Sequence, residues 1–177
     1  MEKVIKEALS YSLASDLHEA WRAPRKKEDG SYEPRMKKSK DLAWNEKHGT
    51  DDVDIANCSF SELPSNWQYE NLEAARVVIN LVYDKVMAKE EFSLEEIESM
   101  AEIVHNEWLK RNQWVFDPQY GDPKLAVPYA ELSEEEKVKD KVQLKPAVEK
   151  VQAYIDGLID VDALCEQYGI PTSKISK

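Results

Sequence analysis

The sequence predicts an all-α fold, made of two helix–long loop–helix units packed together and a short C-terminal helix. Apolar residues recur at the three- and four-residue spacing of a helix, as they do over residues 72–86. Ser93 with Glu96, and Ser133 with Glu136, form the capping-box pattern of a helix start. No segment sustains the alternation of polar and apolar residues that is typical of a half-buried strand.

The order of the elements follows from this periodicity and from the residues that interrupt it. The first helix is expected over residues 3–23, where Pro24 ends it. The polar, poorly periodic segment 41–59 is expected to be a long loop. Further helices are expected to start at about residue 66, at Ser93, at Ser133 with an interruption near Pro146 and a stop at Gly157, and after Asp160 with a stop at Gly169.

Composition limits the classes of protein that the chain can belong to. Its 177 residues are 42% hydrophobic, which is enough for a core. The net charge of -11 repels nucleic acid, and no stretch is apolar enough for a membrane span. We therefore expect a cytoplasmic protein without nucleic-acid or membrane partners. Cys58 and Cys165 have no ligand-like spacing, and no phosphate-binding glycine loop or nucleophile–base pair occurs. Hence no metal, cofactor, catalytic residue or enzymatic activity is expected.

The two halves of the sequence resemble each other. LHEAW at residues 17–21 recurs as VHNEW at 104–108, and the segment from Phe60 recurs from Tyr129. This repeat predicts a first unit over 1–90, a second over 91–157 and a C-terminal helical tail over 158–177. Helical units of this kind usually bury their apolar faces against each other.

The second copy, at about 94–157, resembles the ryanodine-receptor repeat domain. The family pattern is a helix ending in H-x-x-W, a loop with a Trp, and then V-P-Y-x-x-L-x-x-x-E-K-x-x-D. The matching residues are His105, Trp108 and Trp114, followed by the segment 125–141. In the first copy His18, Glu19 and Trp21 match, Ser31 or Tyr32 stands in place of the loop Trp, and CSF replaces V-P-Y.

This resemblance implies a small, helical, non-enzymatic domain that often occurs in tandem. It also implies that an adenine nucleotide can lodge between two tandem copies, with the loop Trp as a stacking surface.

The charge of the chain is unevenly distributed. Residues 22–40 contain eight Lys or Arg and three Asp or Glu, so this segment carries +5 and the rest of the chain -16. The segment is either a solvated charge run or an anion site. In the second case Arg25 and Arg35 would grip a phosphate and Tyr32 would stack on a base.

Four aromatic residues gather in the loop after the second H-x-x-W motif: Trp114, Phe116, Tyr120 and Tyr129. Tyr129, next to Pro128, is expected to anchor the loop. Trp114 either packs in the core or offers a flat face to a ligand, and Phe116 belongs to the same candidate site. Trp21 and Trp108 are expected to pack in the core.

Two pairs of polar residues occupy equivalent positions in the copies. Asn71 and Asp140 are either capping residues at the start of the second helices or groups that read the polar edge of a ligand. His18 and His105 are expected to be structural, each with one ring nitrogen bonded to a loop carbonyl. A metal site or an acid–base pair is the other interpretation.

Two functions remain open. The first is a protein that binds or sequesters a nucleotide-like ligand between the repeats, such as an adenine nucleotide, an ADP-ribose derivative or a cyclic nucleotide, in phage–host or immune signalling. The candidate residues are Trp114, Tyr32, Arg25, Arg35, Asn71, Asp140 and Phe116. The second is a protein-interaction module that uses the aromatic loop. Either function is compatible with an oligomer.

Overall fold

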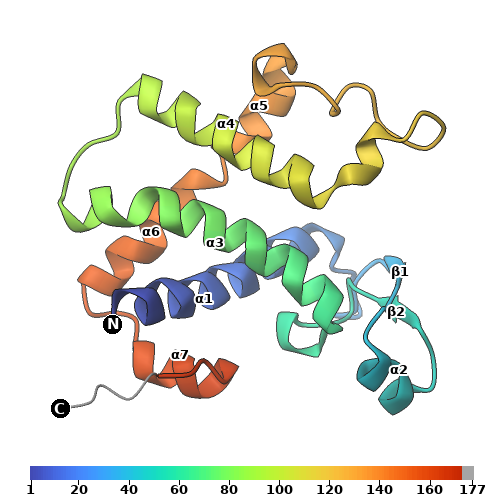
Figure 1. Ribbon diagram of the computed structural model, residues 1–177. Helices are drawn as coiled ribbons and strands as arrows, with labels where there is room; N and C mark the ends of the chain where they lie inside the picture. Colours follow the sequence, from blue (N-terminus) through green and yellow to red (C-terminus); the bar gives the residue numbers. More distant parts are fainter. Residues whose placement is uncertain (173–177) are drawn as a thin grey trace.

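The computed structural model describes residues 1–172, and its fold is all-α, with 64% helix and 5% strand. Two long helices, α1 (Glu2–Arg22) and α3 (Ser65–Met87), run side by side through the centre (Figure 1). The last five residues of the expected tail, 173–177, lie outside the described part of the chain.

The main core forms where α1, α3 and α6 (Leu144–Ile155) meet. Fully buried apolar side chains from each helix fill it, among them Leu9, Leu13, Ile79, Val82, Ala147 and Val151. Arg76 on α3 pairs with Glu7 on α1 and ties the two long helices together at the surface. Helix α7 (Val161–Tyr168) packs on α1, capped by Asp160 and ended by Gly169 in the left-handed conformation, as the sequence predicts.

The second unit adds α4 (Leu94–Arg111) and α5 (Glu134–Lys141), which lie above α3 in Figure 1. A smaller buried cluster of Ala101, Tyr129 and Leu132 joins α4 to the turn before α5. The Tyr129 hydroxyl donates to Glu98 on α4 at 2.8 Å. Tyr129 therefore anchors the long loop, which confirms its expected role.

The expectation of a long loop over residues 41–59 is partly wrong. The segment contains α2 (Leu42–His48) and strand β2 (Asp52–Asp54), which pairs antiparallel with β1 (Met36–Lys38). The Asp41 carboxylate accepts from the Trp44 amide and Gly49 adopts the left-handed conformation, so both helix ends are capped. A helix of seven residues is too short for its apolar periodicity to be recognised in the sequence.

The break between α5 and α6 lies at residues 142–143, before Pro146 rather than at it. Pro146 is the third residue of α6. The N–H groups of the first turn of a helix have no intrahelical acceptor, so the missing N–H of a proline costs no hydrogen bond there. Ser133 caps α5 by accepting from the Glu136 amide at 3.3 Å. The Glu136 side chain pairs with Lys139 at 2.6 Å, so the reciprocal half of the expected capping box is replaced by an ion pair.

Candidate functional site

Each copy of the repeat is pinned by a buried histidine. His18 bonds through Nε2 to the Cys58 carbonyl at 2.8 Å, and His105 bonds in the same way to the Val127 carbonyl at 2.8 Å. Because a carbonyl can only accept, Nε2 carries the hydrogen in both rings and Nδ1 is the acceptor in the neutral form. The structural role expected for these histidines is confirmed.

The similarity of the two copies extends around these histidines. His18 stacks on Trp21 with ring centres 5.8 Å apart, and His105 stacks on Trp108 at 6.3 Å. Two residues after each accepting carbonyl, a 3-10 turn begins, over Phe60–Glu62 in one copy and Tyr129–Glu131 in the other. Each turn runs into the second helix of its unit, α3 or α5. The repeat in the sequence is therefore also a repeat in space.

A cavity of about 300 Å³, here called the first cavity, lies at the end of α1 beside β1 and the start of α3. Its lining includes the indoles of Trp21 and Trp67, the cations Arg35 and Lys37, and Asn71. Trp67 Nε1 donates to the Lys38 carbonyl at 3.0 Å, and the Lys37 ammonium lies 5.6 Å from the Trp67 ring centre. These contacts place a cation over the Trp67 indole at the cavity wall.

The charge of the first cavity is positive. Within residues 1–172, neither Arg35 nor Lys37 has a carboxylate within ion-pair distance. The carboxylate on the cavity wall, Glu70, lies 3.6 Å from Arg111, the last residue of α4. That contact brings the second unit to the edge of the first cavity and leaves both lining cations free for an anion.

A cavity of about 260 Å³, here called the second cavity, occupies the equivalent place between the end of α4 and α5. His105, Trp108, Leu132 and Asp140 line it, and they correspond to His18, Trp21, Leu63 and Asn71 of the first cavity. Asp140 Oδ2 lies 3.6 Å from His105 Nδ1, with 13% of the Asp140 side chain exposed. Burial raises the pKa of Asp140 to about 6, although the His105 charge opposes the rise.

Asn71 and Asp140 are equivalent as expected, but neither is a cap. Asn71 lies within α3, where its Nδ2 donates to the Trp67 carbonyl at 3.2 Å, and Asp140 is the second-to-last residue of α5. The N-caps of these helices are Pro64 and Ser133. The capping interpretation is therefore wrong, and each residue lines the cavity of its own copy.

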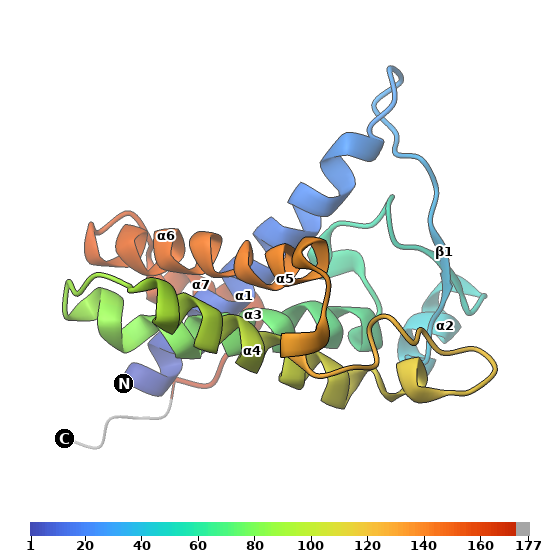
Figure 2. The same cartoon turned by 90° about the horizontal axis from the view of Figure 1, so that it is seen from above.

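The basic segment is divided by the fold. Arg35 lines the first cavity, whereas Arg25 and Tyr32 line neither of the two. Tyr32 is covered by the Arg22 guanidinium, 3.9 Å from its ring centre, and the Arg25 guanidinium lies 4.6 Å from the Trp21 ring centre. Figure 2 shows the hairpin that carries Tyr32 projecting from the end of α1, away from the loop between α4 and α5.

The aromatic loop holds three rings in solvent. Trp114 is 54% exposed, Phe116 50% and Tyr120 75%. Trp114 lies edge-to-face on Trp108 with ring centres 6.5 Å apart and donates to Asn112 at 3.1 Å. Neither Trp114 nor Phe116 lines the first cavity.

This loop is held by hydrogen bonds within itself, which include those from the Gly121 amide to the Asp117 carbonyl at 2.8 Å and from the Asp122 amide to the Val115 carbonyl at 3.0 Å. The Asp117 carboxylate accepts from the amides of Gln119 and Tyr120, both at 2.8 Å. Gly121 passes so close to the loop that an added Cβ would lie 2.3 Å from the Val115 carbonyl oxygen. The three exposed rings are therefore presented by a compact scaffold.

Sequence reasoning missed Lys37 and Trp67, and it assigned Trp21 to the core. Trp21 is 38% exposed because one face lines the first cavity while the Arg25 guanidinium lies over the ring. Trp108 is half-buried beside the second cavity. The repeat is the sequence signal that links Trp67 to a cavity, because Trp67 aligns with Glu136, which lines the second cavity.

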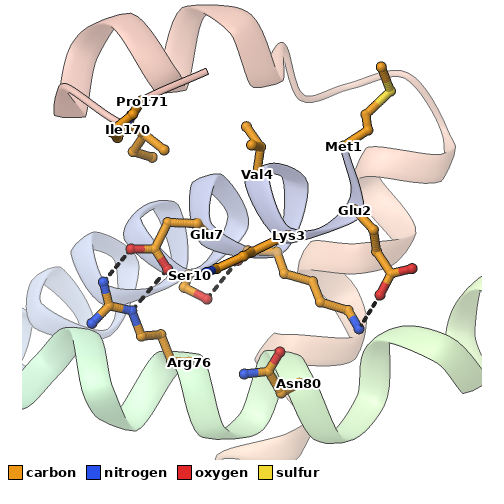
Figure 3. Close-up of a pocket in the computed structure, with 11 residues that line it drawn as sticks. Met1, Glu2, Lys3, Val4, Glu7, Ser10, Arg76, Asn80, Ile170 and Pro171 are labelled. Carbon is orange, nitrogen blue, oxygen red and sulfur yellow. Dashed lines mark hydrogen bonds and ion pairs between the residues drawn. The ribbon is translucent and has the colours of Figure 1, made fainter. Parts of the chain in front are cut away.

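A third cavity, of about 740 Å³, lies between α1, α3 and the segment after α7 (Figure 3). Apart from Lys3, the charged side chains around it are paired within the protein. Arg76 meets Glu7 and Glu73, and Lys6 meets Glu2 at 2.6 Å and Asp84 at 3.2 Å. This internal pairing gives the third cavity no clear charge preference.

Among the described residues there is no cluster of three His, Cys, Asp or Glu side chains that could hold a metal. Within the same range, no helix combines the length and apolarity needed to cross a membrane.

The fold and the two cavities define an all-α protein of two similar helical units, each with a His–Trp cavity. No family model, curated protein or solved structure matches the chain. The resemblance to the ryanodine-receptor repeat stays a prediction.

Proposed function

We propose that the chain is a non-enzymatic small-molecule-binding protein and that the first cavity takes an anionic ligand with a flat ring, such as a nucleotide. The observation that carries the proposal is a pair of cations, Arg35 and Lys37, that have no carboxylate partner within residues 1–172 and line the same cavity as the indoles of Trp21 and Trp67. A phosphate satisfies the cations and a base satisfies an indole face.

The chemistry of each side chain supports a defined role. The Arg35 guanidinium can bind two phosphate oxygens at once, and the Lys37 ammonium acts as a point charge. Asn71 uses one amide hydrogen on the Trp67 carbonyl, which leaves its oxygen and second hydrogen for the edge of a base. A cavity of about 300 Å³ is at the small end of ligand pockets. It suits one base with one phosphate, and a larger nucleotide would extend into solvent.

This proposal keeps the ligand class implied by the family resemblance but moves the site. The resemblance implies a site between the two copies with Trp114 as the stacking surface. The first cavity belongs to the first copy, and the second copy reaches it through the contact of Arg111 with Glu70. Sequestration of a signalling nucleotide follows only if binding is tight, so the dissociation constant decides between sequestration and sensing.

Isothermal titration with AMP, ADP-ribose and a cyclic dinucleotide tests the proposal. Arg35→Gln with Lys37→Gln should weaken binding about 10- to 100-fold, because a hydrogen bond to a charged group is worth about 1.5–3 kcal/mol. The matched control is Lys26→Gln with Lys27→Gln, which makes the same charge change in the same basic segment outside the cavity. Equal binding by the two double variants would contradict the proposal, as would no binding of any nucleotide to the wild type.

A second candidate function is protein docking through the aromatic loop. The observation that favours it is the exposure of Trp114, Phe116 and Tyr120 on an ordered loop, since exposed aromatics are enriched at interfaces. Trp114→Ala with Phe116→Ala should then abolish capture of a partner while nucleotide binding stays unchanged. Loss of nucleotide binding in this variant would instead return the aromatic loop to the ligand site.

A further inference from the structure

The second cavity matches the first in its place within the repeat and is similar in volume, but it differs in charge. Where the first cavity has Asn71, the second has the carboxyl group of Asp140. Where the first has Trp67, the second has Glu136. Lys139 on the same wall pairs with Glu136 at 2.6 Å and is thereby neutralised. The remaining charge in the second cavity is that of Asp140.

Asp140 is poorly satisfied by the protein. Within residues 1–172 its carboxylate accepts no hydrogen bond, and the nearest polar partner is His105 Nδ1 at 3.6 Å. Because His105 uses its Nε2 hydrogen on the Val127 carbonyl, Nδ1 of the neutral ring is itself an acceptor. With the ring neutral and the carboxyl ionised, two acceptors therefore lie 3.6 Å apart, and one donor group between them would satisfy both. The Asp140 oxygens are not among the fully buried side-chain atoms that lack a partner within residues 1–172, so water or a ligand can supply that donor.

The adjoining wall selects the kind of donor. The Trp108 indole lines the same cavity and is half-buried. An indole face attracts cations, and guanidinium groups more often than ammonium groups because they are flat. A guanidinium group also carries several N–H donors in one plane, which suits two acceptors 3.6 Å apart. A cavity of about 260 Å³ admits a group of this size but not a whole nucleotide.

The geometry points to a second ligand site in this protein, in which Asp140, His105 and Trp108 bind a guanidinium-type organic cation. Asp140 pairs with the cation, His105 Nδ1 accepts one further hydrogen bond, and Trp108 covers one face. This site is independent of the nucleotide site proposed above, because it uses a different cavity, different residues and a ligand of the opposite charge. Its failure or success leaves the first proposal unaffected.

The guanidinium group can come from a free small molecule or from an arginine side chain of a partner, and the two sources are distinguished by the probe. Methylguanidinium and a blocked tripeptide with arginine at its centre are titrated in parallel, with the indole N–H signals followed by NMR. Trp108→Phe assigns the signal of Trp108. Saturable binding of methylguanidinium that the peptide does not improve identifies a free cation. Tighter binding of the peptide identifies an arginine side chain.

Controls exist for both the ligand and the protein. Methylurea has the shape of methylguanidinium without the charge, so it should leave the Trp108 signal unmoved. Asp140→Asn should weaken methylguanidinium binding at least tenfold, whereas Glu135→Gln on the same helix, an exposed residue outside the cavity, should not change it. Thermal unfolding of each variant shows that it is folded.

Three results would overturn the inference. The first is the absence of saturable binding to the wild type at concentrations well above the millimolar range, where a single small cation is expected to bind. The second is equal binding of methylguanidinium and methylurea. The third is unchanged binding in folded Asp140→Asn.

Discussion

Replacing Asp140 by Asn should stabilise the protein at neutral pH. In the wild type the side chain is 13% exposed, and burial raises its pKa from 3.8 to about 6. Each unit of pKa shift corresponds to about 1.4 kcal/mol of differential free energy, so the ionised carboxylate destabilises the folded state by up to about 3 kcal/mol. Asn has nearly the same shape, has no charge to desolvate, and can donate an amide hydrogen to His105 Nδ1.

The sign of the pH dependence follows from the direction of the shift. Well below pH 3.8 the carboxyl is protonated in both the folded and the unfolded state, so it contributes no destabilisation. Between about pH 4 and 6 the unfolded chain ionises first, and the folded state loses stability as pH rises. Above about pH 6 the full destabilisation is present and constant. The stability advantage of Asp140→Asn should therefore grow from about 0.5 kcal/mol at pH 4 to about 2–3 kcal/mol at pH 7.5.

Urea denaturation at several pH values measures this advantage as the difference between variant and wild type. Taking the difference at each pH removes the effect of every other carboxylate. In thermal unfolding the advantage appears as a Tm increase of about 5–10 °C at pH 7.5 for a chain of this size. Glu135→Gln is the control and should give no such trend. The reasoning is refuted if Asp140→Asn is less stable than the wild type at pH 7.5, or if the difference is the same at pH 4.

Two further predictions concern the loop and the histidine anchors. Gly121→Ala should lower the free energy of unfolding by about 1–3 kcal/mol, because its Cβ would lie 2.3 Å from the Val115 carbonyl oxygen; urea denaturation measures this, and an unchanged midpoint would show that the loop relaxes freely. His18→Ala should cost about 2–3 kcal/mol, because it leaves the Cys58 carbonyl without its donor and opens a space in the core; the same denaturation experiment tests it, and a loss below 1 kcal/mol would contradict the anchor role.

The histidine anchors could be predicted because their signal is local and repeated. The same H-x-x-W spacing ends a helix in both halves, and a buried imidazole needs a partner for its N–H group. The sequence therefore indicates a loop carbonyl as that partner, and His18 and His105 each have one. The identity of the carbonyl, in Cys58 or Val127, depends on how the long loop returns to the helix, which local spacing does not encode.

The first cavity was only half predictable. Arg35 is recognisable in the sequence as part of a charged run, but its place in the same cavity as Trp67 depends on β1. This strand positions Lys37, and the backbone carbonyl of Lys38 accepts a hydrogen bond from Trp67 Nε1. A strand of three residues leaves no usable alternation in the sequence. Tyr32 looked equally suitable as a stacking residue, and only the structure shows the Arg22 guanidinium lying on its ring. Long-range pairing therefore decided which members of the basic segment face a cavity.

Comparison of the two copies distinguishes the residues that both cavities share from those that differ between them. Each keeps the histidine, the tryptophan three residues later, and the leucine after the 3-10 turn, and these residues determine the position of the cavity. The two copies differ at other positions of the cavity wall. Asn71 and Trp67 of the first copy correspond to Asp140 and Glu136 of the second. Within residues 1–172 the Asp140 carboxylate accepts no hydrogen bond, whereas Asn71 donates to the Trp67 carbonyl. The cationic ligand inferred above would give the Asp140 carboxylate a partner that residues 1–172 do not supply as a hydrogen bond.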